Sequence, residues 1–163
     1  MPELPEVETV VRSIRDRVVG NSLSSMHVSW IRTLDNFDEP LFNKCIKNKK
    51  VLSVDRRAKY ILIRFKAAVL AVHLRMTGKL YISNDIKSEG SHVRVYFKVE
   101  NRFLVFSDTR KFGRIYLFPD TSHLDSKLGI EPLSSDFTSE YLYRQLKSRK
   151  KEMKYFLLDQ SIV

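Results

Sequence analysis

Apolar and charged residues alternate at helical spacing over the first twenty positions of the chain. The apolar positions recur every three or four residues: Leu4, Val7, Val10, Val11, Ile14 and Val18. Pro5 falls in the first turn, where its missing N–H costs nothing, and Gly20 follows the last apolar position. The pattern therefore predicts an amphipathic helix over residues 3–19.

From Ser22 to Phe118 the spacing changes to that of short strands rich in Val, Ile, Leu and aromatic residues. In chain order the segments are SLSSMHVSW, KVLSVDRR, YILIRF, AVLAVHL, KLYIS, VRVYFKV, RFLVFSD and RIYLF. Residues 38–47 look like a brief helical insertion. Several segments alternate apolar with polar residues, as half-buried antiparallel strands do. About eight such strands predict an α+β, mainly β fold, in which a two-sheet antiparallel sandwich carries the N-terminal helix.

Helical spacing returns after Pro119. The apolar positions are Phe137, Tyr141, Leu142 and Leu146, followed by Met153, Phe156 and Leu157. Thr138 stands where this helical region would begin. Apolar Ile162 and Val163 close the sequence, and because a domain seldom ends on exposed apolar residues, this end suggests a fragmentary second domain. We therefore expect a β-sandwich domain over residues 1–120, then a linker and an incomplete helical domain over 121–163.

The composition narrows the classes of partner. The 163 residues carry 29 Lys and Arg against 19 Asp and Glu, a net charge of +10. An excess of this size suggests an anionic polymer or an anionic membrane surface, although a basic surface without a specific role is the simpler alternative. Cys45 is the single cysteine, so an internal disulfide and a multi-cysteine metal site are excluded within these residues. No secretory signal or membrane span is evident, and a reduced, cytoplasmic setting is expected.

Four separated segments together resemble the formamidopyrimidine-DNA glycosylase family, the bacterial enzymes that excise oxidised purines. They are MPELPEVETV (1–10), RRAKYILI (56–63), HLRMTGKL (73–80) and SDTRKFGR (107–114), and LGIEPL (128–133) and residues 147–163 extend the match. Leu4 stands where the endonuclease VIII branch typically has glycine, so the opening looks like the formamidopyrimidine branch.

The resemblance implies an N-terminal β-sandwich, then a helix–two-turn–helix domain, then a zinc finger. The sequence stops inside the second of these, and the finger would lie beyond Val163. No cofactor and no metal site are therefore expected in these residues. The implied partner is damaged double-stranded DNA, bound by a monomer, with no membrane involved.

By resemblance, Pro2 is the nucleophile once Met1 has been removed. An α-amino group has an ordinary pKa of roughly 7.7–8.0, so part of it is neutral near pH 7. Attack on the sugar C1′ would expel the damaged base and leave an iminium cation. This electron sink would acidify the C2′ proton and permit loss of the 3′ phosphate.

The same resemblance assigns three further catalytic residues. Glu3 is the general acid, which donates a proton and later takes one back, and Glu6 supports it. Helix capping is the alternative for these carboxylates, and Glu8 is expected to exemplify it. Lys59 is the strand lysine that contacts phosphate beside the lesion and aids proton transfer, although a solvated strand end would carry the same charge.

Extrusion of a base from duplex DNA leaves a hole that a side chain must fill. Met76, Arg110 and Phe112 match the three void-filling residues of the family, each at a predicted turn between strands. For Met76 or Phe112 taken alone, core packing would be the simpler interpretation. Lys111 stands where the family commonly has arginine, and a phosphate contact survives that change, whereas bidentate geometry does not.

Three more DNA contacts rest on resemblance. His92 matches the second of a histidine pair, with Gly90 at the first position. Arg149 matches a phosphate ligand and Lys154 a lysine near the lesion pocket, although a solvated helix face would carry the same charges. Four other residues have no assigned chemistry: Trp30, His27, His123 and Cys45.

The resulting hypothesis is a bifunctional glycosylase and abasic-site lyase that removes 8-oxoguanine and formamidopyrimidines and then cleaves by β,δ-elimination. One alternative is a catalytically inactive domain that binds DNA weakly through its basic face. The other is a relative that acts on oxidised pyrimidines.

Overall fold

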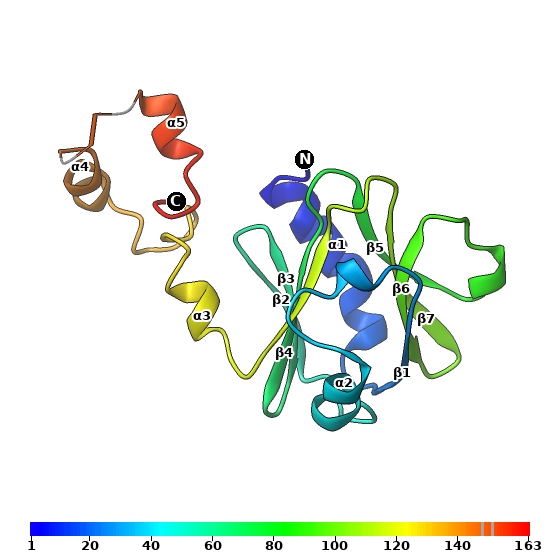
Figure 1. The fold of residues 1–163 in the computed structure, drawn as a ribbon. Coiled ribbons are helices and arrows are strands. Elements are labelled where there is room, and N and C mark those ends of the chain that lie inside the picture. Colours follow the sequence, from blue (N-terminus) through cyan, green and yellow to red (C-terminus); the bar gives the residue numbers. More distant parts are fainter. Residues whose placement is uncertain (148, 151) are drawn as a thin grey trace. The chain divides into compact units, whose positions relative to one another are not determined.

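Eight strands among the described residues form two four-stranded antiparallel sheets, which confirms the predicted sandwich (Figure 1). One sheet has the order β1-β6-β7-β5 and the other the order β2-β3-β4-β8. The strands are β1 (Leu23–Val28), β2 (Ser53–Arg57), β3 (Tyr60–Phe65), β4 (Ala68–His73), β5 (Gly78–Ser83), β6 (Val93–Val99), β7 (Arg102–Asp108) and β8 (Arg114–Phe118). Apolar side chains between the sheets form the core.

The computed structural model describes residues 1–147, 149–150 and 152–163. They fall into two compact units, Met1–Asp120 and Thr121–Val163. The helices are α1 (Leu4–Val18), the short 3-10 turns η1 (Ile31–Thr33) and η2 (Ile86–Ser88), α2 (Glu39–Cys45), α3 (Ser122–Asp125), α4 (Ser139–Lys147) and α5 (Met153–Leu157).

Helix α1 closes one side of the sandwich. It contacts β2 and β5, which are edge strands of the two different sheets. Its buried face is Val7, Val11, Ile14 and Val18, as the spacing of apolar residues predicts. Each such side chain contributes about 2 kcal/mol by leaving water. The N-terminus of α1 is therefore fixed on a rigid scaffold.

The segment 29–37 meets β8, the edge strand of the second sheet. Leu34 forms a parallel bridge with Ile115 of β8. The side chain of Asn36 exchanges two hydrogen bonds with the backbone of Leu117, at 2.9 and 2.8 Å. These contacts satisfy backbone groups of an edge strand and hold the loop in place.

Two loops cross from one sheet to the other at the same end of the sandwich. Loop 74–77 connects β4 to β5, and loop 109–113 connects β7 to β8. The flanking strand residues are paired, His73 with Arg114 and Gly78 with Asp108. Each loop therefore begins and ends next to an end of the other loop, because β4 is paired with β8 and β5 with β7. The two loops lie side by side.

The second unit has its own internal contacts. Gly129 N donates to the carbonyl of Gln160 at 2.8 Å, and the Tyr141 hydroxyl donates to the carbonyl of Ile162 at 2.7 Å. Ile162 is buried. Thr138 Oγ1 accepts from Tyr141 N at 3.1 Å and so caps α4. Helix α3 was not predicted.

Candidate active site at the N-terminus of the first helix

The first turn of α1 is capped by Glu6. Its Oε2 accepts a hydrogen bond from Glu3 N at 2.9 Å, which satisfies one of the free N–H groups at a helix start. The prediction that Glu8 acts as a cap is wrong. Glu8 lies two residues further along and contacts Arg12 at 3.0 Å and Arg56 at 3.5 Å. It faces β2, and that placement has no signature in the local sequence.

Glu3 and Lys59 are brought together. Lys59 lies in the two-residue turn between β2 and β3, and its Nζ is 2.7 Å from Glu3 Oε2. The Lys59 side chain is only 8% exposed, whereas that of Glu3 is 51% exposed. A buried ammonium needs a partner, and this carboxylate provides it. The pair places a carboxylate and an ammonium in contact beside the start of the chain.

A cavity of about 430 Å³ opens next to loops 74–77 and 109–113 and the N-terminus. Met1, Met76 and Phe112 supply apolar walls, and Arg75 and Arg114 supply positive charge. Met76 is 44% exposed and Phe112 is 47% exposed, so neither belongs to the core. Large apolar side chains at loop tips with this exposure are available to a partner.

Asp108 joins the two loops that carry these side chains. Its Oδ1 accepts from the Thr77 hydroxyl at 2.5 Å and from Arg110 N at 3.1 Å, and its Oδ2 accepts from Gly113 N at 2.7 Å. Burial alone would raise the pKa of Asp108, but these hydrogen bonds and one from the backbone of Phe112 lower it. The carboxylate is thus a fixed acceptor at the base of both loops.

The loop 109–113 is also stabilised by cation–π contacts. The guanidinium carbon of Arg110 lies 4.8 Å from the ring centre of Phe112. Lys111 Nζ lies 4.2 Å from the ring centre of Trp30, in the segment that follows β1. Such contacts contribute about 0.5–1 kcal/mol when exposed. Trp30 was given no chemistry from sequence, and it supports a predicted DNA-binding residue.

Backbone strain concentrates at the same positions. Among the described residues, five non-glycine residues have positive φ, and three of them are Ala58 (47°), Arg75 (57°) and Lys111 (62°). They stand directly before Lys59, Met76 and Phe112 respectively. A left-handed conformation costs an L-residue roughly 1–2 kcal/mol and is typical of functional sites. At each point, this backbone turn sets the direction of the site residue that follows.

His73 lies at the end of β4 beneath the loops. Its Nδ1 accepts from Arg75 N at 3.1 Å, so the neutral ring carries its proton on Nε2. The ring meets that of Tyr60 edge-on, with centres 4.7 Å apart. Burial, together with the charges of Arg75 and Lys59, lowers the pKa of His73 to about 4. His73 is therefore neutral near pH 7.

The remaining predicted DNA contacts lie at the surface. His92 is exposed, its Nδ1 is 3.5 Å from Arg94 Nη2, and its carbonyl accepts from Asp108 N at 2.9 Å. Arg149 and Lys154 belong to the second unit and are described within it alone. Arg149 Nη1 lies 3.9 Å from Asp159 Oδ2, and Lys154 is exposed on α5.

Within the described residues, no three His, Cys, Asp or Glu side chains come together as a metal site requires. None of the helices in that part of the chain is long and apolar enough to cross a membrane. Cys45 is a half-buried free thiol.

Comparison with known proteins bears directly on this geometry. Residues 1–115 match the family described as the formamidopyrimidine-DNA glycosylase N-terminal domain. The chain is 40% identical to the formamidopyrimidine-DNA glycosylase of Protochlamydia amoebophila, with 100% of this chain and 60% of the relative covered. It is likewise 40% identical to that of Pelotomaculum thermopropionicum, with 100% of this chain and 61% of the relative covered.

Solved structures show the same likeness. A crystal structure of the Lactococcus lactis enzyme in complex with DNA containing an abasic site matches with a TM-score of 0.90 and 30% identity. The match covers 99% of this chain and 62% of that one. The chain thus spans about three fifths of the length of the relatives it matches. On these matches, the chain belongs to the formamidopyrimidine-DNA glycosylase family.

Proposed function

We propose that the chain carries the catalytic chemistry of a DNA glycosylase and abasic-site lyase for oxidised purines, such as 8-oxoguanine and formamidopyrimidines. The observation that carries the proposal is the 2.7 Å contact of Glu3 with Lys59 at the N-terminus of α1. Met1, two residues before Glu3, lines a cavity together with Met76 and Phe112. Family membership supports base-excision repair as the setting.

The nucleophile in this proposal is the nitrogen of Pro2. Met1 lines the cavity, so its removal would leave the Pro2 amine at that cavity. The nitrogen lone pair forms a bond to the sugar C1′ while the bond from C1′ to the base breaks. The base leaves with the electron pair and takes up a proton.

Proton transfer falls to Glu3 and Lys59. Ring opening of the sugar places a proton on its ring oxygen and yields an iminium between C1′ and Pro2. The iminium draws electrons from the adjacent C–H bond, so a base can remove the C2′ proton while the 3′ phosphate leaves. A second elimination would release the 5′ phosphate. In such a pair the ammonium can supply a proton and the carboxylate can accept one.

Void filling falls to the two loops anchored by Asp108. A flipped base leaves an unstacked gap in the duplex, and apolar side chains or a planar cation can occupy it. Met76 and Phe112 offer exposed apolar ends, and Arg110 offers a guanidinium held against the Phe112 ring. In the proposal Met76 and Arg110 fill the gap and Phe112 wedges the neighbouring step.

Electrostatics support double-stranded DNA as the partner. The net charge is +10. Phosphate contacts are proposed for Lys111 and Arg149, a DNA contact for His92, and a place near the lesion pocket for Lys154. Within this proposal residues 1–120 are the catalytic domain, and residues 121–163 begin the helix–two-turn–helix domain. The protein would act as a monomer on DNA in the bacterial cytoplasm.

The test measures cleavage of a labelled duplex that contains a single 8-oxoguanine opposite cytosine. Cleavage of the same duplex without the lesion is measured for comparison. We expect cleavage at the lesion, its loss in Glu3→Gln and its retention in Glu39→Gln. Glu39 is the matched control because it lies in the first turn of α2. Binding without cleavage would indicate the inactive DNA-binding domain. Preferential cleavage at an oxidised pyrimidine would indicate the second alternative.

A further inference from the structure

We propose that Arg56 and Glu8 form a clamp that positions Lys59 against Glu3. Arg56 is then a positioning residue for the proposed chemistry, and the inference rests on that proposed function. No motif at the site assigns this task to Arg56 or Glu8. The clamp is built from two contacts of a single guanidinium.

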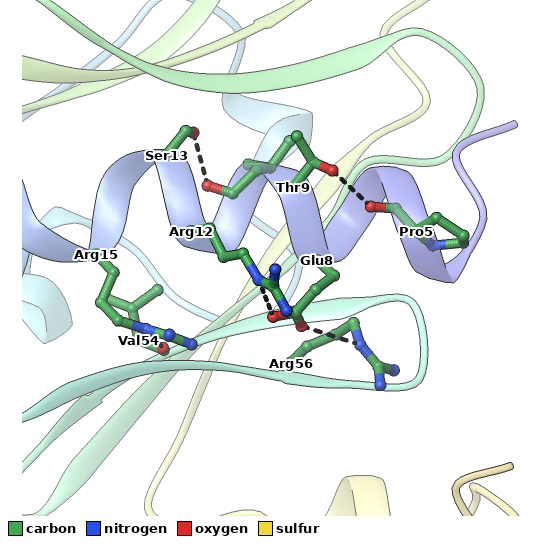
Figure 2. A network of polar contacts seen from close by, with 9 residues as sticks. Pro5, Glu8, Thr9, Arg12, Ser13, Arg15, Val54 and Arg56 are labelled. Atoms are coloured by element: carbon green, nitrogen blue, oxygen red, sulfur yellow. Dashed lines mark hydrogen bonds and ion pairs between the residues drawn. The ribbon is translucent and has the colours of Figure 1, made fainter. Parts of the chain in front are cut away.

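The first contact joins Arg56 to the first helix. Arg56 Nε lies 3.5 Å from Glu8 Oε2, and the Arg56 side chain is 13% exposed. Figure 2 shows Glu8 between Arg56 on β2 and Arg12 on α1. Arg12 Nε holds the other carboxylate oxygen of Glu8 at 3.0 Å. The carboxylate of Glu8 is therefore contacted from both sides, by Arg12 of the helix and by Arg56 of β2.

The second contact joins Arg56 to the turn that carries Lys59. Arg56 Nη1 donates to the carbonyl of Ala58 at 2.9 Å. Ala58 has a φ of 47°, a conformation that needs surrounding contacts to persist. The guanidinium provides one such contact and simultaneously reaches the helix. The planar guanidinium of Arg56 has several N–H groups and can contact Glu8 and the Ala58 carbonyl at the same time. A lysine ammonium is a compact point charge without this geometry.

Together the contacts make two links between α1 and the β2–β3 turn. Glu3 meets Lys59 at 2.7 Å, and Glu8, about one turn later on the helix, meets Arg56. Arg15 Nε adds a hydrogen bond to the carbonyl of Val54 at 3.0 Å, which holds the helix along β2 (Figure 2). Arg56 thus adds a link between the turn and the helix to the contact of Lys59 with Glu3. Loss of Arg56 would remove that added link.

The direct test needs no DNA. The free protein is labelled with trace acetic anhydride, and acetylation of Lys59 is measured by peptide mass spectrometry. We expect Lys59 to react at least about threefold faster in Arg56→Gln and in Glu8→Gln, because the turn opens more often. The matched control is Arg64→Gln, which removes the Arg64–Asp55 ion pair (3.1 Å) between the same two strands, away from the turn. It should leave Lys59 labelling unchanged.

The second measurement is functional. At saturating DNA with one abasic site, the rate of borohydride trapping should fall about tenfold in Arg56→Gln, while the Kd changes less than about twofold. Arg56→Lys should keep the Kd but should restore neither the rate nor the protection of Lys59. Unchanged labelling in Arg56→Gln, or full rescue by Arg56→Lys, would overturn the clamp. Failure of the unmodified protein to trap DNA would contradict the proposed function and leave the labelling result to decide the clamp.

Discussion

The Thr77 hydroxyl donates to Asp108 Oδ1 at 2.5 Å, and this contact ties together the two loops that cross between the sheets. The same oxygen accepts from Arg110 N in the second loop. A buried, charged acceptor at this point makes the geometry of one loop depend on the other. The proposed void-filling residues Met76 and Phe112 are therefore presented by one joined unit.

Substitution Asp108→Asn tests that joint. An amide has only one accepting oxygen, so its NH₂ group would face either Thr77 and Arg110 or Gly113, all of which donate. We expect the free energy of unfolding to fall by on the order of 3 kcal/mol, measured by urea denaturation. Asp55→Asn is the control, because that carboxylate is half exposed, and it should cost less than about 1 kcal/mol. Equal losses in both variants would contradict the proposed role of Asp108.

Truncation of the exposed loop residues should separate binding from stability. Met76→Ala and Phe112→Ala remove side chains that are 44% and 47% exposed, so unfolding should change by less than about 0.5 kcal/mol. Affinity for duplex DNA with an abasic site should fall roughly tenfold, measured by fluorescence anisotropy. Leu52→Ala, another exposed apolar residue, should leave affinity unchanged. Undiminished affinity in both loop variants would rule out void filling.

Gly78 should not tolerate a side chain. A Cβ at this position would lie 2.4 Å from the carbonyl oxygen of Leu74, and the backbone would have to shift. We expect Gly78→Ala to lower the melting temperature and to weaken binding of abasic DNA, because Met76 lies in the displaced loop. Gly90→Ala meets nothing within 4 Å and should be close to neutral. A neutral Gly78→Ala would show that the loop has room to adjust.

His73 should make stability depend on pH. The unfolded histidine takes up a proton near its ordinary pKa of 6.5, whereas the folded one does so only at about 4. The unfolded state therefore binds more protons between these values, and the free energy of unfolding should fall as the pH falls through this window. The loss is on the order of 3 kcal/mol. Urea denaturation from pH 7 to pH 4 measures it.

The matching variant is His73→Gln, whose amide oxygen can still accept from Arg75 N. Its free energy of unfolding should show a shallower decline over the same range. His27→Gln, at an exposed position on β1, should retain the full decline. An identical pH profile for all three proteins would show that His73 is not the group responsible.

Periodicity and short apolar runs were enough to predict the sandwich. The first helix buries one face and β8 buries alternate residues, whereas β4 is a continuous apolar run that is buried throughout. The spacing of Val7, Val11, Ile14 and Val18 predicted the face that packs. Helix α3 was missed because a four-residue helix contains too few positions to show a period. Family resemblance, and not periodicity, suggested the residues for chemistry, and the structure brings Glu3 and Lys59 into contact.

The residues missed from sequence act through contacts distant in the chain. Asp108 and Thr77 are joined by one hydrogen bond, and Lys111 lies over Trp30 by the packing of two loops. Neither contact produces a local pattern of residue types. Glu8 was misassigned for the same reason: an acidic residue near a helix start suggests capping, and only the register of α1 on β2 directs it to Arg56.

The most direct test of the central claim is borohydride trapping on duplex DNA with one abasic site, followed by peptide mass mapping. Intact mass first establishes whether Met1 has been removed. The account predicts a covalent sugar adduct on Pro2 when Met1 is absent, and no adduct when Met1 is retained. An adduct of equal yield with Met1 retained, or one located on Lys59 instead, would contradict it.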